Sequence, residues 1–355
     1  MLLKVFHLPP LIYPVEDIVI VTPCGQLHLE IMNKETTEFE KVYDDRYAGD
    51  YMDSDDYSAW ARADLRTRII TEWLLSVPAN PAKLLDYGVG VGGWLPTLTR
   101  IFPKAEIYGV EISGTAIEKC RSKFPNFHFH QLNGNTSPLA DESFDLIFSY
   151  HVLEHVDDIQ SSIRDISRLL VKGGYAFITF PCGNPGSFLD RSMNLYKEGR
   201  EHSKTGEMPF FFEMPEGHVR RLTSDETISY FEKNDFAIRK QNFSGHFFGT
   251  IDWLCRGTGP SYINRMFSGR QAKNKFAQIQ LETIRKSFLF VHKILNFQHK
   301  DLSIKKNPVK QLALWLLKNL ALLLDRLIVN MSYYEWKLLK NRKSGTAQYL
   351  IFEKI

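Results

Sequence analysis

From Lys83 onward, short apolar segments alternate with segments in which apolar residues recur every three to four positions. The first pattern is typical of buried strands and the second of helices, and their alternation predicts βαβ units around a parallel sheet. We expect strands at 84–86, 106–111, 127–132, 144–150 and 175–180, and helices at 92–102, 113–124 and 159–170. The predicted fold class is therefore α/β, with a doubly wound, mostly parallel sheet.

The segments around this alternation divide the chain further. Residues 39–248 are expected to form the core, with one helix at 60–75 before the first strand and another at 224–233 before a strand at 236–243. Residues 249–345 are basic and helical throughout, which predicts an insertion. Residues 346–355 then supply the last strand, which we expect to pair antiparallel with its predecessor at the sheet edge.

The N-terminal residues 1–38 are expected to be an addition to the core. Alternating apolar and polar residues around Pro23-Cys24-Gly25 predict a small β-hairpin over 17–32. Residues 1–12 show no apolar segment followed by a cleavage site, so we expect no export signal and a cytoplasmic protein. The four cysteines form no C-x-x-C pair, which indicates reduced thiols: Cys24, Cys120, Cys182 and Cys255.

Composition adds a charge asymmetry to this picture. With 44% hydrophobic and 24% charged residues, the chain of 355 residues is typical of a folded globular protein and not of a disordered chain or a coiled-coil rod. The net charge of +3 conceals 17 Lys and Arg against 4 Asp and Glu between Ser261 and Lys343. This segregation predicts a surface that meets anions.

The basic segment contains an amphipathic helix. At about 100° per residue, one side of it gathers the residues Leu312, Ala313, Leu316, Leu317, Leu320, Leu323, Leu324 and Leu327. Lys318-Asn319 and Asp325-Arg326 interrupt the apolar sequence before it reaches the roughly 20 residues that cross a bilayer. The helix can pack on its own domain, form a homodimer or lie on an anionic membrane surface as a peripheral anchor. We expect no nucleic-acid partner, because no recognisable RNA-binding module accompanies the basic surface.

The most informative motif runs from Leu84 to Gly93, where glycines follow a strand directly and open a helix. Gly88, Gly90 and Gly93 satisfy G-x-G-x-x-G, which permits a sharp turn and a close approach of a ligand to the main chain. Glu111 ends the next strand, where a carboxylate can accept hydrogen bonds from two ribose hydroxyls. These features predict a ligand that contains ribose, without separating a dinucleotide from other nucleosides.

The sequence at this point resembles the class I S-adenosylmethionine-dependent methyltransferases, which have a Rossmann-like fold. Residues 84–93 look like the first motif of that family and Glu111 like its ribose-binding acid. Residues 143–147 with 152–156 resemble its fourth strand and following loop, and 169–174 resemble the turn into its fifth strand. The resemblance implies S-adenosylmethionine as cofactor. It assigns cofactor-binding roles to Asp86, Gly88, Gly90, Glu111, Ile112, Asn133 and Gly134.

The same resemblance directs attention to histidines on the acceptor side. A base is needed only where the acceptor must lose a proton, and histidine suits this because its pKa lies near working pH. His151, His155, His202 and His218 are the candidates, of which we select His218 and His155, with a loop-structural role as the alternative for His155. His151, Glu154 and His155 could also ligate a divalent ion, but we expect no metal.

The resulting functional prediction is methyl transfer from S-adenosylmethionine to a small-molecule or lipid-linked acceptor, at an oxygen atom. Tyr43, Tyr47, Tyr51 and Tyr57 lie where this family commonly has a lid over cofactor and acceptor. A non-catalytic Rossmann-like binding protein is one alternative. A nicotinamide-dependent oxidoreductase is another, although it would not be expected to carry Val-Leu-Glu-His-Val and Leu-Leu-Val-Lys-Gly-Gly together.

Overall fold

The architecture is taken from a computed structural model of the chain. It describes residues 40, 41, 43–45, 47, 48, 64–77, 79–197, 218–299 and 308–355. The hairpin predicted over 17–32 and the candidate base His202 lie outside these residues.

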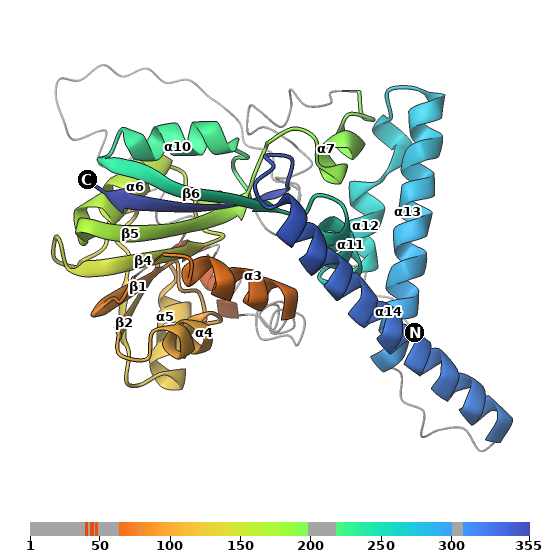
Figure 1. Cartoon of the computed structure of the whole chain (residues 1–355), viewed down its shortest axis with the longest axis horizontal. Coiled ribbons are helices and arrows are strands. Elements are labelled where there is room, and N and C mark those ends of the chain that lie inside the picture. The colour runs from red at the N-terminus through yellow and green to blue at the C-terminus, as the bar shows by residue number, and fades with distance from the viewer. Residues whose placement is uncertain are drawn as a thin grey trace, which may run out of the picture.

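The described residues form one seven-stranded sheet with the order β3-β2-β1-β4-β5-β7-β6 (Figure 1). The first five strands are parallel, and β7 runs antiparallel to both of its neighbours. The strands are β1 (Lys83–Tyr87), β2 (Glu106–Glu111), β3 (His128–Gln131), β4 (Phe144–Tyr150), β5 (Leu170–Pro181), β6 (Phe236–Ser244) and β7 (Ala347–Lys354). The predicted fold class, α/β with a mostly parallel sheet and an antiparallel last strand, is confirmed.

The position of β7 differs from the prediction in one respect. β7 does pair antiparallel with β6, but it also pairs with β5, so that β6 and not β7 forms the edge. Residues 348–352 are buried on both faces of the sheet, whereas most of β6 is only half-buried. A continuous buried run of this kind suits a central strand, because both faces are covered.

Helices cover both faces of the sheet (Figure 1). On one face, α3 (Asp64–Leu74), α4 (Leu95–Ile101) and α5 (Gly114–Lys123) share a core with strand residues such as Leu84 and Phe148. On the other face, α6 (Ile159–Leu169) and α10 (Ser224–Glu232) pack against Leu85 and Ile147. Successive strand residues point to opposite faces, which explains why Leu84 and Leu85 belong to different cores.

Helices from the predicted insertion lie at one end of the sheet (Figure 1). Their bounds are α11 (Phe248–Arg256), α12 (Pro260–Met266), η1 (Gly269–Gln271), α13 (Lys275–Leu295), η2 (Asn296–His299) and α14 (Pro308–Leu339). Together with α7 (Phe188–Met193) they enclose a separate apolar core that includes Leu254, Phe267 and Leu281. None of the described helices is long and apolar enough to cross a membrane.

The leucine side of α14 does not pack on the described parts of its own domain. Leu312, Leu316, Leu320 and Leu323 are between 49% and 64% exposed, whereas Leu324 packs against the insertion core. Packing on its own domain, one of the three uses left open for this helix, therefore does not account for most of this side among the described residues. The residues that do pack lie on the opposite side of the helix, at Ala321, Val329 and Trp336.

Candidate functional site

A cavity of about 790 Å³ opens where the carboxyl ends of β1, β2 and β4 meet the helical insertion. Ligands of α/β sheets bind at this edge, and small-molecule sites are typically about 300–1,000 Å³. The lining joins the glycine turn after β1, the end of β2, the loop after β4 and the segment 252–265. Both the nucleoside-type motif and the histidine cluster therefore open into one space.

The glycine turn has a backbone that side chains would disrupt. Gly88 and Gly90 have φ of +83° and +53°, in the left-handed region that favours glycine. A Cβ on Gly88 would come within 2.2 Å of Val152 Cγ2, and one on Gly90 within 2.9 Å of the Tyr47 hydroxyl. Both predicted glycines line the cavity, and their lack of side chains lets a ligand approach the main chain.

Glu111 lies at the end of β2, and its carboxylate holds the glycine turn. Its Oε2 accepts a hydrogen bond from Gly90 N at 3.0 Å, and its Oε1 accepts from Ile112 N at 2.9 Å and Ser113 N at 3.3 Å. Burial raises the pKa of Glu111. Burial, and then the charge of Glu111, also raise the pKa of Asp86 to about 8. Two adjacent buried carboxyl groups make this end of the cavity suited to hydroxyls and to a cationic group.

The residues around position 44 lie beside this part of the cavity. Tyr43 and Tyr47 line it, as the lid prediction requires, while Tyr51 and Tyr57 lie outside the described residues. Asp44 Oδ1 accepts hydrogen bonds from Ser113 Oγ at 2.5 Å and Thr115 N at 3.0 Å. Burial acts to raise the pKa of Asp44, but these bonds outweigh it and lower the pKa. A charged Asp44 thus ties this segment to the start of α5.

The predicted adenine contacts are only partly brought together. Ile112 and Gly134 line the cavity, whereas Asn133 is exposed and does not line it. Asn133 instead pairs through its backbone with Thr136 across a tight turn. Asn135, on the other side of Gly134, lines the cavity. Sequence reasoning missed Asn135, although the Asn-Gly-Asn sequence offered both amides as candidates.

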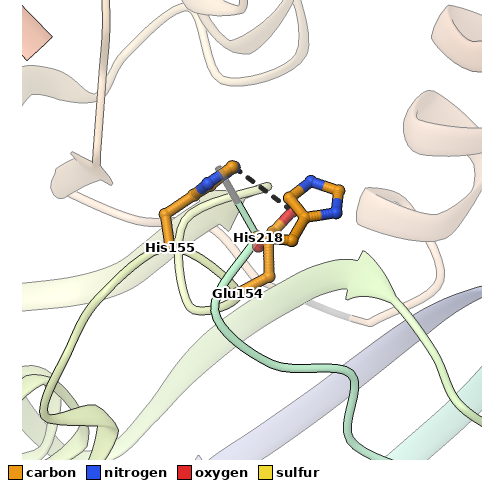
Figure 2. Close-up of side chains that lie close together, drawn as sticks. All are labelled: Glu154, His155 and His218. Carbon is orange, nitrogen blue, oxygen red and sulfur yellow. Dashed lines mark ion pairs between the residues drawn. The ribbon is translucent and has the colours of Figure 1, made fainter. Parts of the chain in front are cut away.

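A buried carboxylate organises the histidines after β4. Glu154 is fully buried, and its Oε1 lies 2.8 Å from His151 Nδ1 and 3.8 Å from His155 Nε2. Figure 2 shows His155 and His218 on either side of this carboxylate, and their ring centroids are 4.8 Å apart. The two predicted catalytic histidines are therefore neighbours, and His151, His155 and His218 all line the cavity.

Burial and charge set the protonation of this cluster. Burial would raise the pKa of Glu154, but His151, His155 and His218 together lower it to about 2, so the carboxylate is ionised. Burial, followed by the charge of His155, lowers the pKa of His218 to about 3. His218 is thus a neutral imidazole at physiological pH. It can accept or donate a hydrogen bond, but it is a weaker base than an ordinary histidine.

His151 occupies an unusual backbone conformation. Its φ of +56° is uncommon for a residue with a side chain, and strain of this kind clusters at functional sites. His151 N donates to Thr179 O at 2.8 Å, which fixes the loop to β5. Because a carboxylate beside Nδ1 orients an imidazole, Glu154 holds the His151 ring in place at the cavity.

The cluster also contains donors that a metal ion could use. One atom each of Glu154, His155 and His218 lie within 4.8 Å of one another, and Glu154 Oε2 has no hydrogen-bond partner among the described residues. Two imidazole nitrogens and a carboxylate oxygen suit ions such as Zn²⁺. The expectation that the protein uses no metal stays a prediction.

The insertion supplies a wall of the cavity that sequence reasoning did not find. Trp253, Arg256, Tyr262 and Arg265 line it from α11 and α12. Arg256 is held by ion pairs of 2.7 Å to Asp252 and 2.7 Å to Asp325, so it connects α11 with α14. No local motif marks these residues, because they meet the β4 loop only through the tertiary fold.

A glycine turn after the first strand and a buried acid at the end of the second define an α/β protein with a nucleoside-type site. Residues 85–178 match the family model described as "Methyltransferase domain". A demethylmenaquinone methyltransferase from Chlorobaculum parvum is 29% identical over 99 residues, which cover 28% of this chain and 41% of the relative. A malonyl-[acyl-carrier protein] O-methyltransferase from Methylococcus capsulatus is 36% identical over 104 residues, which cover 28% of this chain and 38% of the relative.

Among solved structures, a putative sarcosine dimethylglycine methyltransferase from Galdieria sulphuraria aligns with a TM-score of 0.40 and 15% identity, over 84% of this chain and 85% of that chain. The chain spans about two fifths of the length of the two curated relatives. Residues 85–178 are thus similar to methyltransferase domains, which agrees with the sequence resemblance to the class I S-adenosylmethionine-dependent methyltransferases.

Proposed function

We propose that the protein is an enzyme that transfers a methyl group from S-adenosylmethionine to a small-molecule acceptor. The observation that carries this proposal is the shared cavity, in which the glycine turn and Glu111 face the same space as His155 and His218. A binding module of this fold would need only the first of these halves. The second half supplies groups that can orient an acceptor and receive its proton.

In the cofactor half, each proposed role is supported by position. The turn at Gly88 and Gly90 allows close approach to the methionine portion, and Asp86 lies buried beside it. Glu111 would accept the ribose hydroxyls, and Ile112 would contact the adenine. For the adenine edge we propose Asn135 together with Gly134, because these line the cavity and Asn133 does not.

In the acceptor half, positioning accounts for much of the expected rate, because a sulfonium already carries an activated methyl group. We propose oxygen as the acceptor atom, supported by the O-methylation named for one relative. The methyl group would then move from sulfur to oxygen, leaving a neutral thioether, while the hydroxyl proton passes to His151. This replaces His218 and His155, the bases selected from the sequence, because burial makes His218 a weaker base. His155 and His218 would bind the acceptor, and Glu154 would orient His151.

We also propose a lipid-linked acceptor and peripheral membrane association, of which the second can be tested without methyl transfer. The insertion wall places Trp253 and Tyr262 at the cavity, which suits an acceptor with an apolar portion. The net positive charge of residues 261–343 suits an anionic lipid surface. A homodimer is the alternative use of that surface.

Calorimetric titration with S-adenosylmethionine, S-adenosylhomocysteine and NAD tests the cofactor. Binding of the first two and not of NAD is expected, and binding of NAD alone would overturn the proposal. Incubation with methyl-labelled S-adenosylmethionine and a deproteinised cell extract tests catalysis, since an enzyme transfers label to an extract component. If the protein binds the cofactor tightly but transfers no methyl label to any extract component or to purified quinones, this result favours a non-catalytic binding protein.

A further inference from the structure

One side of α14 presents an exposed apolar surface, which is interrupted at Asn330. Leucines recur along it at intervals that return to the same side of a helix, and they are between 49% and 82% exposed: Leu312, Leu316, Leu320, Leu323, Leu327 and Leu338. We call this set the α14 leucine stripe. At 1.5 Å per residue it runs for about 39 Å. No described residue covers it, and apolar surfaces of this extent mark sites of interaction.

The opposite side of α14 is fixed to the protein. Ala321, Val329 and Trp336 are at most 8% exposed, and Lys337 and Tyr333 both bond to Glu72 of α3. The Arg256–Asp325 ion pair of 2.7 Å attaches the middle of the helix to α11. Figure 1 shows α14 passing the helical end of the molecule, with its N-terminal part extending beyond α13. From Ala321 onward the helix therefore has a fixed orientation, in which its leucine stripe faces away from the protein. Before Ala321 the helix is exposed on most sides, and Trp315 and Leu317 add apolar surface there with exposures of 55% and 49%.

Charge distinguishes between the occupants that could cover this stripe. The described residues in 261–299 and 308–343 carry 14 Lys and Arg against 3 Asp and Glu. Exposed Phe276 and Phe290 accompany exposed Lys286 and Lys293 on α13. A second copy would bring two such positive surfaces together, which like-charge repulsion opposes. An anionic surface complements the same charge.

We propose that the α14 leucine stripe docks on an anionic lipid bilayer surface. The leucines would enter the boundary between headgroups and acyl chains, with α14 parallel to the membrane plane. Exposed basic residues of α13 and α14, such as Lys286, Lys293 and Arg326, would meet lipid phosphates. The proposal concerns binding to lipid and does not depend on methyl transfer. Its electrostatic part is screened by salt, because the basic residues act through solvent.

Cosedimentation of the full chain with phosphatidylcholine vesicles tests this surface. We expect the bound fraction to rise with the content of phosphatidylglycerol and to fall at high salt. The variant Leu316→Asp/Leu320→Asp/Leu323→Asp should reduce the vesicle partition coefficient by about tenfold or more, because each charged side chain opposes insertion. Leu75→Asp is the matched control, since Leu75 is a 62% exposed leucine outside α14. Equal thermal melting of both variants would verify folding.

Three results would overturn the proposal. The first is a wild-type protein that stays in the supernatant at every phosphatidylglycerol content. The second is a triple variant that binds vesicles as the wild type does, which would assign binding to another surface. The third is a wild-type dimer in light scattering that the triple variant converts to a monomer, with no vesicle binding by either, which would make the stripe a subunit interface.

Discussion

The two walls of the cavity are built in different ways. At the cofactor wall, main-chain groups and buried carboxyls predominate: Gly88 and Gly90 give access to the backbone, and Glu111 is held by three amide hydrogen bonds. At the insertion wall, side chains such as Trp253 and Arg256 of α11 line the space, and the Arg256–Asp325 ion pair joins α11 to α14. A wall made of backbone tolerates little change, whereas a wall made of side chains can change its ligand by substitution. We infer that cofactor recognition lies in the first and acceptor choice in the second.

Glu154→Gln should have the largest effect on turnover, because it acts on the acceptor side of the cavity. The amide keeps the shape but removes the charge that orients His151, so we expect turnover to fall by about 10²- to 10⁴-fold, the range for loss of general-base catalysis. His218→Ala should slow turnover by about 10²-fold, since a neutral His218 binds the acceptor. Single-turnover transfer of labelled methyl measures both.

Binding of S-adenosylmethionine by these two variants should stay within about threefold of wild type, as expected for losses confined to the transition state. Glu118→Gln is a control, because Glu118 is a 71% exposed glutamate outside the cavity. If wild type and Glu154→Gln have equal turnover, the role of the histidine cluster is structural.

Glu111→Ala should act on the cofactor wall alone. The variant loses the proposed ribose contacts, and charge-assisted hydrogen bonds contribute about 1.5–3 kcal/mol, so affinity for S-adenosylmethionine should fall by about 10- to 150-fold. It also leaves the Gly90, Ile112 and Ser113 amides without their acceptor. Calorimetry on the folded variant measures the effect, and unchanged affinity would reject the ribose assignment.

The difference between the walls also explains what the sequence could predict. The bounds of β2 and β4 match the predicted ranges, and the cofactor motif lies on strand ends whose order follows from βαβ connectivity. Asn133 was selected by its alignment to a family position, but the turn at Gly134, with φ of +63°, brings Asn135 to the cavity instead. Contacts made by the insertion, such as Arg256 with Asp325, depend on tertiary packing and have no periodic signal.

Arg256→Ala tests whether the insertion wall is independent of cofactor binding. Removing the guanidinium leaves Asp252 and Asp325 without the partner that joins α11 to α14. We expect the free energy of unfolding to fall by about 1.5–3 kcal/mol, and methyl transfer at limiting acceptor to fall with it. Affinity for S-adenosylmethionine should be unchanged. Arg239→Ala, which breaks the half-exposed pair with Glu353, is the control and should cost less than about 1 kcal/mol. If the affinity for S-adenosylmethionine falls as much as methyl transfer does, the two walls are coupled.

Asp86→Asn should show how far the buried pair of carboxyl groups destabilises the folded protein. The pKa of Asp86 is raised from 3.8 to about 8, so its contribution to stability is fully present below pH 3.8 and is lost as pH rises through about 8. Without ligand, the variant should therefore gain stability relative to wild type across this interval, by at least about 1 kcal/mol in the free energy of unfolding. Thermal melts at several pH values measure it. A constant difference in Tm from pH 4 to pH 9 would contradict the assignment.

Removal of metal ions should have the smallest effect of these changes, and we expect methyl transfer to be almost unaffected. Glu154 Oε1 already bonds to His151 Nδ1 at 2.8 Å, and the proposed reaction uses Glu154 as the partner of His151 and not as a ligand. We therefore expect dialysis against EDTA to leave labelled-methyl transfer within about twofold of the untreated enzyme, since the sulfonium donor is already activated. The opposing argument is the cluster of Glu154, His155 and His218 donors within 4.8 Å. Elemental analysis of the purified protein decides between them. The expectation fails if the protein holds a stoichiometric ion, if removal of that ion abolishes transfer, and if Glu154→Gln or His218→Ala no longer retains it. In that case the cluster is a metal site, and Glu154 binds the ion instead of orienting His151.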